Sequence, residues 1–286
     1  MRLYQINPKA VLQFLRTELE LYINTHKLKS LVLGVSGGID SAVVAAIAAP
    51  VCNKLGVHLI GISLPSETNK EEEIIRADKI GRAYCSDFHT IYIDKQVKMF
   101  TDGNMALTTP QTKEDKIRRG NIKARVRMIH LYDWAQGCHG CVLSTDNLTE
   151  LYLGFWTLHG DVGDIGMIQN LWKTDVYRLS QYIADTETNI DKKEALQLCI
   201  DAIPTDGLGI TSSDLEQIGA VTYEEVDDIL SAYINHNDMT NVEHPIIKRY
   251  KNTDFKRNNP YNFEIPYPFE NDCIKFKING VGRTIL

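Results

Sequence analysis

The sequence lacks several features that define whole classes of protein. No stretch of its 286 residues approaches the roughly 20 apolar residues that a membrane span needs, and the N-terminus M-R-L-Y-Q-I-N-P has no secretory apolar region. There is no excess of positive charge: the net charge is −6 and the isoelectric point about 5.8, which argues against a general nucleic-acid binder. Internal repeats, low-complexity segments and linkers rich in proline or glycine are also missing. We therefore expect a cytoplasmic protein of one domain, with no membrane and no nucleic acid as partner.

Cysteine is sparse and scattered. The six cysteines include only one close pair, Cys138 and Cys141, with His139 between them. A structural zinc site needs a second ligand pair at matching spacing, and the sequence has none. Reduced thiols in a plain loop are therefore the expectation for this C-x-x-C.

What the chain does contain is an apolar strand that breaks at paired glycines and restarts as an Ala-rich helix, over residues 31–46 (L-V-L-G-V-S-G-G-I-D-S-A-V-V-A-A). A strand, a tight turn and a helix N-terminus bring several backbone N–H groups to one small volume, where a phosphate fits. Asp40 adds a carboxylate that repels a phosphate unless a cation lies between them, so Mg²⁺ is expected with the nucleotide. The alternative is an ordinary turn with Asp40 as the helix cap.

Two common nucleotide-binding motifs do not fit this turn. A Walker A loop needs a lysine, but Ile39 stands five residues after Gly34 and no lysine follows. The dinucleotide motif G-x-G-x-x-G fails because Ser36 occupies the place of its second glycine. The run S-G-G-I-D-S instead resembles the signature of the ATP pyrophosphatases, or PP-loop family, which split ATP between its α and β phosphates to adenylate a substrate.

Strands and helices alternate along the rest of the chain. After the first strand, the pattern predicts strands near residues 57–64, 90–93 and 142–144, and helices near residues 71–84 and 116–134. This order predicts an α/β fold, a parallel sheet with helices on both faces, whose ligands bind at the carboxyl ends of the strands. An irregular C-terminal extension is expected to follow. Within it, Thr222 and Glu225 form a capping box that opens a helix, whose acidic run is expected to be a solvated face.

Two arginines of the long predicted helix differ in their expected surroundings. At about 100° per residue, Arg125 lies within about 40° of Ile129, which places it on the apolar stripe, whereas Arg127 is expected to be solvated. A guanidinium on the apolar stripe needs either an internal acidic partner or an anionic ligand, and both alternatives remain open.

Three further motifs follow: T-D-N-L-T-E from Thr145, G-F-W-T-L-H-G-D-V-G-D from Gly154 and L-W-K-T-D from Leu171. Together with S-G-G-I-D-S and G-N-I-K-A-R-V-R-M from Gly120, they resemble the NAD synthetase family. In that family a K-A-R-x-R-M helix, a G-T-D-N-x-x-E strand end and a G-D-x-x-x-D-I loop follow the PP-loop in the same order. The resemblance covers about residues 30 to 260 and implies a Rossmann-like fold of the adenine nucleotide alpha hydrolase type.

The resemblance also implies an activity. The family amidates deamido-NAD with ammonia, using ATP, and releases NAD, AMP and pyrophosphate through an adenylated intermediate; such an enzyme is a ligase that forms a carbon–nitrogen bond. A symmetric homodimer is implied as well. Only 33 residues precede Gly34, fewer than the roughly 50 that the smallest ordinary domains need, so we expect residues 1–286 to form a single synthetase domain without a glutaminase domain.

Site residues are implied wherever the motifs match. Asp40 and Lys173 would serve catalysis, and Asp40 and Glu150 would hold Mg²⁺. Arg125, Phe155, Asp164 and Lys256 would contact deamido-NAD, with Phe155 stacked on the nicotinate ring. The residues expected to contact ATP are Gly34, Val35, Ser36, Gly37, Gly38, Ile39, Asp40, Ser41, Thr145, Lys173 and Thr205.

Three departures from the family pattern concern the dinucleotide rather than ATP. Ser144 stands where the family usually has glycine, Leu158 where it has lysine, and Phe255 where it has histidine. Two other functions remain as alternatives: a tRNA-thiolating PP-loop enzyme that uses Cys138 and Cys141, and a nucleotide-binding protein without catalysis. The acidic balance and the T-D-N-L-T-E motif disfavour the first alternative, and the intact acidic pair, Asp40 and Glu150, disfavours the second.

Overall fold

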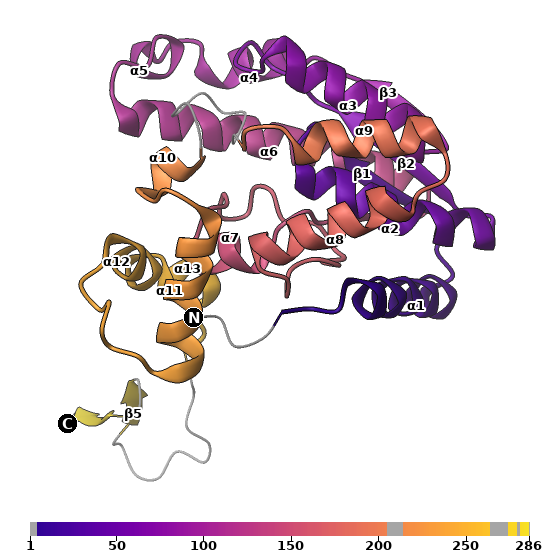
Figure 1. The fold of residues 1–286 in the computed structure, drawn as a ribbon. Coiled ribbons are helices and arrows are strands. Elements are labelled where there is room, and N and C mark those ends of the chain that lie inside the picture. The colour runs from indigo at the N-terminus through magenta and orange to yellow at the C-terminus, as the bar shows by residue number, and fades with distance from the viewer. Residues whose placement is uncertain (1–4, 205–213, 264–273, 279–280, 286) are drawn as a thin grey trace.

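The centre of the protein is a four-stranded parallel sheet with the strand order β3, β2, β1, β4 (Figure 1). The structure is a computed structural model and describes residues 5–204, 214–263, 274–278 and 281–285. Leu31 of the central strand pairs with Leu59 on one side and with Cys141 on the other. The strands are β1 (Ser30–Gly34), β2 (His58–Ser63), β3 (Asp87–Thr90) and β4 (Gly140–Leu143).

Helices cover both faces of this sheet, as the alternation of elements predicts (Figure 1). Because successive side chains of a strand point to opposite faces, Leu31 and Leu33 enter one apolar core while Val32 enters the other. The first core is closed by α1 (Pro8–His26), α2 (Ile39–Leu55), α3 (Glu71–Tyr84), α8 (Lys173–Thr186) and α9 (Ile190–Ile200). The second is closed by α4 (Asp94–Thr101) and α6 (Lys113–Gly137), with the short α5 (Met105–Thr108) beside them.

Helix α2 is buried on almost all sides because it lies between the sheet and the outer helices α1, α8 and α9. Alanine, valine and isoleucine dominate its sequence, which suits a helix with no solvated face. Gly38 is its N-cap and supplies no side-chain acceptor, so the backbone N–H groups of the first turn are left for another partner.

The C-terminal part, expected to be irregular, is largely helical. Its helices pack around a third apolar core that includes Leu153, Val226, Leu230 and Ile246, and they form the lobe at the lower left of Figure 1. The C-terminal elements are α10 (Asp214–Ile218), α11 (Tyr223–His236), α12 (Pro245–Asn252) and α13 (Asp254–Arg257), followed by an antiparallel hairpin of β5 (Ile274–Ile278) and β6 (Val281–Ile285). The short α7 (Leu148–Leu153), which comes earlier in the chain, contributes Leu153 to the same core.

Strand β3 begins three residues before its predicted position. It is an edge strand whose Asp87 and His89 are mostly exposed, so its sequence is too polar to indicate a strand. The apolar signal came from Ile91 and Ile93, which follow the strand and pack against the second core.

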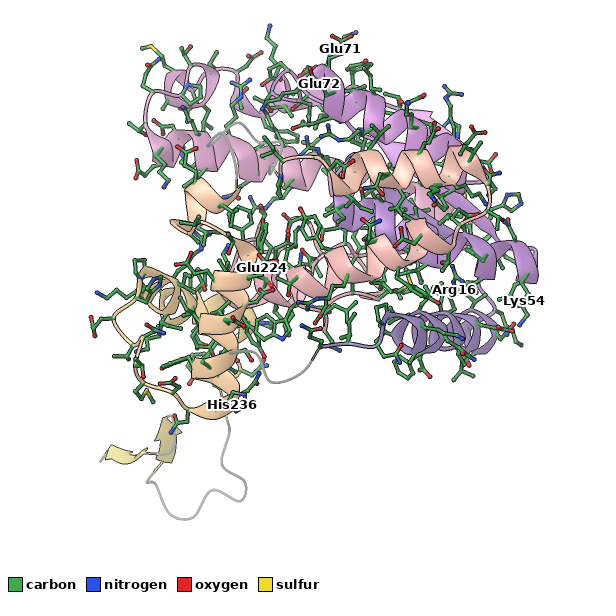
Figure 2. The ribbon with its side chains drawn as sticks, viewed as in Figure 1. Arg16, Lys54, Glu71, Glu72, Glu224 and His236 are labelled. Atoms are coloured by element: carbon green, nitrogen blue, oxygen red, sulfur yellow. The ribbon has the colours of Figure 1, made fainter. Side chains whose placement is uncertain are left out.

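The outer surface is richly charged. Figure 2 shows Glu71 and Glu72 on the outer side of α3 and Lys54 near the end of α2, where it pairs with Glu20 of α1 at 2.7 Å. Among the described residues, no helix combines the length and apolar character that crossing a membrane would require.

Candidate active site

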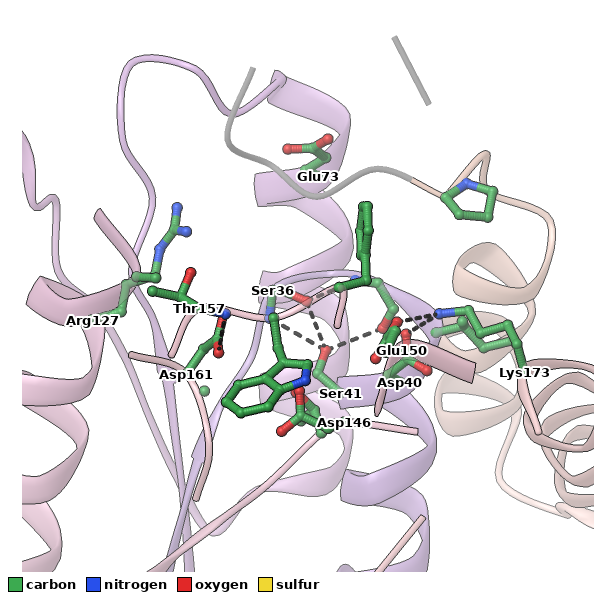
Figure 3. A pocket seen from close by; sticks show the side chains of 18 of the residues that line it. Ser36, Asp40, Ser41, Glu73, Arg127, Asp146, Glu150, Thr157, Asp161 and Lys173 are labelled. Atoms are coloured by element: carbon green, nitrogen blue, oxygen red, sulfur yellow. Dashed lines mark hydrogen bonds and ion pairs between the residues drawn. The ribbon is translucent and has the colours of Figure 1, made fainter. Parts of the chain in front are cut away.

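A cavity of about 910 Å³ opens at the carboxyl ends of the strands, where the topology predicts a ligand. It is lined by the turn between β1 and α2, by the end of β2, by α6, by the segment 154–161 and by α12 and α13. Figure 3 shows side chains of the turn between β1 and α2, of α6 and of the segment 154–161 around this space. The expected ATP contact Thr145 also lines the cavity, whereas Thr205 falls outside the described residues.

The turn between β1 and α2 has a defined shape. Gly37 has a φ of +80°, and a Cβ at this position would lie 2.2 Å from the carbonyl oxygen of Glu73, so only glycine fits. The Ser36 and Ser41 hydroxyls lie 3.1 Å apart, and Gly38 N–H donates to Ser36 Oγ. Arg76 Nε donates to the Gly37 carbonyl at 2.9 Å and fixes the loop from α3. The turn therefore presents hydroxyls and a helix N-terminus to the cavity, as a phosphate site requires.

An acidic pair and a lysine from distant parts of the chain meet beside this turn (Figure 3). The Lys173 ammonium lies 2.5 Å from Asp40 Oδ2 and 3.2 Å from Glu150 Oε1. Asn147 Nδ2 donates to the other Asp40 oxygen at 3.0 Å. Burial alone would lower the pKa of Lys173, but the charges of Asp40 and Glu150 raise it well above its ordinary value. Lys173 is therefore a permanent cation at neutral pH.

The same acidic pair suits a magnesium ion. Within the described residues, no three His, Cys, Asp or Glu side chains group closely enough to hold a metal alone. Mg²⁺ in nucleotide sites is commonly held by one or two carboxylates together with substrate phosphates. Asp40 and Glu150 converge on one cation and border the phosphate turn, so their chemistry fits a metal shared with a nucleotide.

Lys173 is held in place by a buried acid that was predicted to lie on a solvated helix face. Asp227 of α11 is fully buried; it accepts from Thr149 Oγ1 at 2.5 Å and from Thr174 N at 3.0 Å. Thr149 Oγ1 in turn accepts from the backbone N–H of Lys173 at 2.9 Å. The N-terminus of α8 is thus capped from the C-terminal lobe. The predicted solvated face is correct for Glu224, which is exposed, and wrong for Asp227.

Two further acids of the cavity, Asp146 and Asp161, were not selected from the sequence. Asp146 accepts from Ser144 Oγ at 2.7 Å, so the serine that replaces the family glycine orients this carboxyl. Asp161 accepts from the Thr157 N–H at 2.8 Å. Burial raises the pKa of Asp146 to about 6, and burial together with the charge of Asp146 raises the pKa of Asp161 to about 7.

These raised pKa values predict a pH-dependent stability. Because the folded protein holds the Asp161 proton more tightly than the unfolded chain does, the resulting stabilisation is complete below pH 3.8 and is lost as the pH rises to about 7. Asp161→Asn removes this titration, so its stability relative to the unsubstituted protein should improve between pH 5 and pH 8, by on the order of 2 kcal/mol. Melting temperatures of both proteins at the two pH values test this. An equal difference at both pH values would contradict it.

The residues predicted to contact the second substrate divide into two groups. Phe155 and Lys256 line the cavity, whereas Arg125 and Asp164 do not. Arg125 is exposed and donates to the Leu158 carbonyl at 2.9 Å. The Asp164 carboxylate accepts from the backbone N–H of Val142, at the end of the edge strand β4, at 2.8 Å. The expected place of Arg125 on the apolar stripe is therefore wrong, and a role for either residue in binding stays a prediction.

Arg127, which was expected to be solvated, is instead half-buried beside the cavity. It lines the cavity, and it donates from Nε to the Leu64 carbonyl at 3.0 Å and from Nη2 to Asn69 Oδ1 at 3.1 Å. The prediction failed because it used Ile129 to define the buried stripe, and Ile129 is 61% exposed.

A parallel sheet, a glycine turn before a helix N-terminus and a lysine between two acids are typical of nucleotide-dependent enzymes of the PP-loop type. Comparison with known proteins narrows this class. A model of the NAD synthase family matches residues 11–260. The chain is 32% identical over 238 residues to the NH(3)-dependent NAD(+) synthetase of Thermoplasma volcanium, covering 81% of this chain and 88% of that protein. It is 35% identical over 207 residues to the protein of the same name from Methanosarcina mazei, covering 71% and 73%.

The chain belongs to the NAD synthase family. Among solved structures, the NMN synthetase of Francisella tularensis has a TM-score of 0.73 and 28% sequence identity, covering 93% of this chain and all of that one. The comparisons confirm the predicted class, an ammonia-dependent NAD synthetase and hence a ligase, over a tRNA-thiolating enzyme or a protein without catalysis.

Proposed function

We propose that this enzyme amidates the nicotinate carboxylate of deamido-NAD with ammonia at the expense of ATP, forming NAD, AMP and pyrophosphate. The observation that most supports this proposal is the position of the Lys173 ammonium between Asp40 and Glu150, beside the turn between β1 and α2. With ATP bound at the turn, this ammonium would supply positive charge near the departing pyrophosphate, and stabilisation of that charge is the main demand of phosphoryl and adenylyl transfer.

The residues divide between two steps. In the first step, the turn from Ser36 to Ser41 binds the ATP phosphates while the nicotinate carboxylate, placed against Phe155, attacks the α-phosphate. Lys173 stabilises the charge that develops on pyrophosphate. In the second step, ammonia forms a bond to the carbonyl carbon of the acyl-adenylate, the bond from that carbon to the AMP oxygen breaks, and the attacking nitrogen loses a proton to solvent, so no side chain serves as a nucleophile. Positioning by the walls of the cavity therefore accounts for much of the rate.

Asp40 and Glu150 are the residues that would hold Mg²⁺ against the polyphosphate. When bound, Mg²⁺ would neutralise negative charge on the phosphates. Asn147 fixes one oxygen of Asp40 and leaves the other directed at Lys173. The two acids are thus already oriented toward a shared cation.

Ammonia is the proposed nitrogen source, and a single synthetase domain is the proposed organisation. Both proposals are supported by relatives named for ammonia dependence, of which the chain covers 88% and 73%. The test is incubation of purified protein with ATP, MgCl₂, ammonium chloride and deamido-NAD, followed by chromatography for NAD and AMP. A replacement of ammonium by glutamine should abolish product; equal turnover on ammonia-free glutamine would refute ammonia dependence.

A second candidate substrate is nicotinate mononucleotide, which carries the same carboxylate on a smaller nucleotide. Two observations favour it: the 28% identity and full coverage of the Francisella tularensis NMN synthetase, and the position of Arg125 and Asp164 outside the cavity. Competition between equal concentrations of the two nucleotides, with both amides quantified, gives the ratio of their kcat/KM values. A ratio above one for the dinucleotide supports the first proposal, and a ratio below one supports the second.

We also propose that the enzyme is a homodimer that associates through α6. Arg125, Ile129 and Tyr132 succeed one another at helical spacing on one exposed face, and Tyr132 OH donates to the carbonyl of Val162, another exposed apolar residue. An exposed apolar patch bordered by a charged residue is typical of an interface. A symmetric contact there would also bring Arg125 near the partner subunit.

Ile129→Arg should convert the dimer to a monomer, because it places an unpaired charge in the centre of the proposed contact. Light scattering coupled to size exclusion measures the mass. Phe14→Arg on α1 is the matched control, since Phe14 is also 61% exposed. The proposal fails if Ile129→Arg keeps the dimer mass or if Phe14→Arg alone dissociates it.

A further inference from the structure

Two cations from the C-terminal lobe line the cavity and form no ion pair with any carboxylate among the described residues. Arg249 of α12 lies with its guanidinium carbon 5.2 Å from the centroid of the Phe155 ring and donates from Nε to the Leu153 carbonyl at 2.9 Å. Lys256 of α13 donates to the Gly154 carbonyl at 2.7 Å and to the Trp156 carbonyl. Neither cation is within ion-pair distance of a carboxylate in the part of the chain that the structure describes.

The burial of these cations makes the lack of such an ion pair significant. Burial lowers the pKa of Arg249. Burial and repulsion from Arg249 lower the pKa of Lys256, and the charge of Asp161, which lies beyond ion-pair distance, opposes this shift only in part. Two like charges held together away from water are costly unless an anion joins them. Arg257, from the same lobe, shows the structural alternative: it bonds to the Tyr152 and Tyr250 carbonyls and pairs with Asp254.

An unused donor lies on the same wall. Trp156 lines the cavity, its ring is 5.5 Å from the Lys256 ammonium, and its Nε1–H is buried without a hydrogen-bond partner among the described residues. A buried N–H group without an acceptor costs free energy, so an acceptor from a ligand would be stabilising. Arg249, Lys256 and Trp156 therefore offer donors only, all on the wall that Phe155 shares.

We propose that Arg249, Lys256 and Trp156 form the subsite for the phosphate on the nicotinate-bearing ribose. This inference rests on the proposed function and specifies how the nucleotide substrate is distinguished from its nucleoside. A planar ring for the base and a guanidinium for the phosphate lie 5.2 Å apart, and an arginine is suited to bidentate phosphate contacts. The phosphate of the mononucleotide and the proximal phosphate of the dinucleotide share this chemistry.

The test compares substrates with and without the phosphate. For Arg249→Gln, kcat/KM should fall about 10- to 100-fold on nicotinate mononucleotide or deamido-NAD, whichever is the better substrate, as expected for one charge-assisted contact. On nicotinate riboside, which lacks the phosphate, kcat/KM should change less than about threefold, and KM for ATP should stay within about twofold. Lys251→Gln is the matched control, because it removes an exposed charge from the same helix outside the cavity. The factor by which kcat/KM falls is compared between nicotinate mononucleotide and deamido-NAD, and this comparison distinguishes a subsite for a terminal phosphate from one for a bridging phosphate.

Several results would overturn the subsite. An equal loss on nucleotide and riboside would show that Arg249 only supports the fold, and a raised KM for ATP alone would assign the cation to ATP. If Arg249→Gln does not fold, Trp156→Phe retains the ring and removes the Nε1–H; it should weaken binding of the nucleotide and leave that of the riboside unchanged. If the unsubstituted enzyme turns over neither nucleotide, the proposed function fails, and calorimetric affinities for nicotinate mononucleotide and the riboside still test the subsite.

Discussion

Asp40→Asn is expected to reduce kcat by about 100- to 1,000-fold while leaving the melting temperature within a few degrees of the original. The amide keeps an oxygen that can accept from Asn147 Nδ2, so the local geometry survives. What is lost is the negative charge that orients Lys173 and that would share a magnesium ion with the nucleotide. Steady-state kinetics at saturating ATP and nucleotide measures the effect.

A matched control separates this effect from a general change of charge. Asp78→Asn makes the same chemical change in an exposed pair with Arg82 on α3, and it should leave kcat unchanged. A titration of MgCl₂ adds a second measurement, because loss of one carboxylate ligand should raise the magnesium concentration needed for half-maximal rate. If Asp40→Asn has a normal kcat and needs no more magnesium for half-maximal rate than the unsubstituted enzyme, the proposed role of Asp40 is wrong.

The parts of the site that could be predicted from the sequence are those encoded locally. The phosphate turn requires an apolar strand, two glycines and a helix start within a few residues, and Gly37 shows why: its positive φ and its contact with Glu73 leave no space for a side chain. The convergence of Asp40, Glu150 and Lys173 came from motif order, since no local pattern connects residues 133 positions apart.

The errors occurred where burial depends on neighbours that the local pattern does not reveal. Arg125 and Arg127 lie two positions apart on one helix. The prediction took Ile129 as part of the buried side of that helix, and this choice put Arg125 rather than Arg127 on the buried side. Asp227 stands in an acidic run that is typical of a solvated face, yet α11 turns this one carboxylate toward the buried N-terminus of α8. The sequence did contain one indication that Asp227 is buried. It stands at a core-facing position of an amphipathic helix, on the same side as Val226 and Leu230.

A similar error concerns the two aspartates of the segment 157–164. The family motif drew attention to Asp164, whose carboxylate accepts from the backbone N–H of Val142 in β4 and from Tyr132 OH at 3.2 Å. Asp161, three residues earlier, lines the cavity. A sequence pattern alone does not decide which of the two carboxylates the backbone turns toward the cavity.

Asp227→Ala is expected to lower both stability and turnover. Its carboxylate accepts from the buried Thr149 hydroxyl and from the N–H of Thr174, so its removal takes this acceptor from two buried donors and weakens the cap of α8. The free energy of unfolding should fall by about 2 to 4 kcal/mol, the sum of a lost cap and a lost charged hydrogen bond. Chemical denaturation measures this change.

The effect on turnover follows from the position of Lys173 as the first residue of α8. In the variant, Thr149 no longer bonds to residue 227 and no longer fixes the backbone N–H of Lys173. The ammonium of Lys173 therefore shifts from its position between Asp40 and Glu150. A displacement of about 1 Å can cost on the order of 100-fold in rate. We therefore expect kcat to fall at least tenfold at a temperature where the variant is fully folded, with KM for ATP changed much less.

Asp227→Asn is the conservative comparison that distinguishes positioning from bulk stability. Its amide oxygen can accept from the Thr174 N–H while its amide nitrogen donates to Thr149 Oγ1, so much of the geometry is retained without the charge. It should recover most of the stability and of the turnover that Asp227→Ala loses. If Asp227→Ala is destabilised but turns over normally once folded, Asp227 only stabilises the junction between α8 and α11, and Lys173 is positioned by its two acidic partners alone.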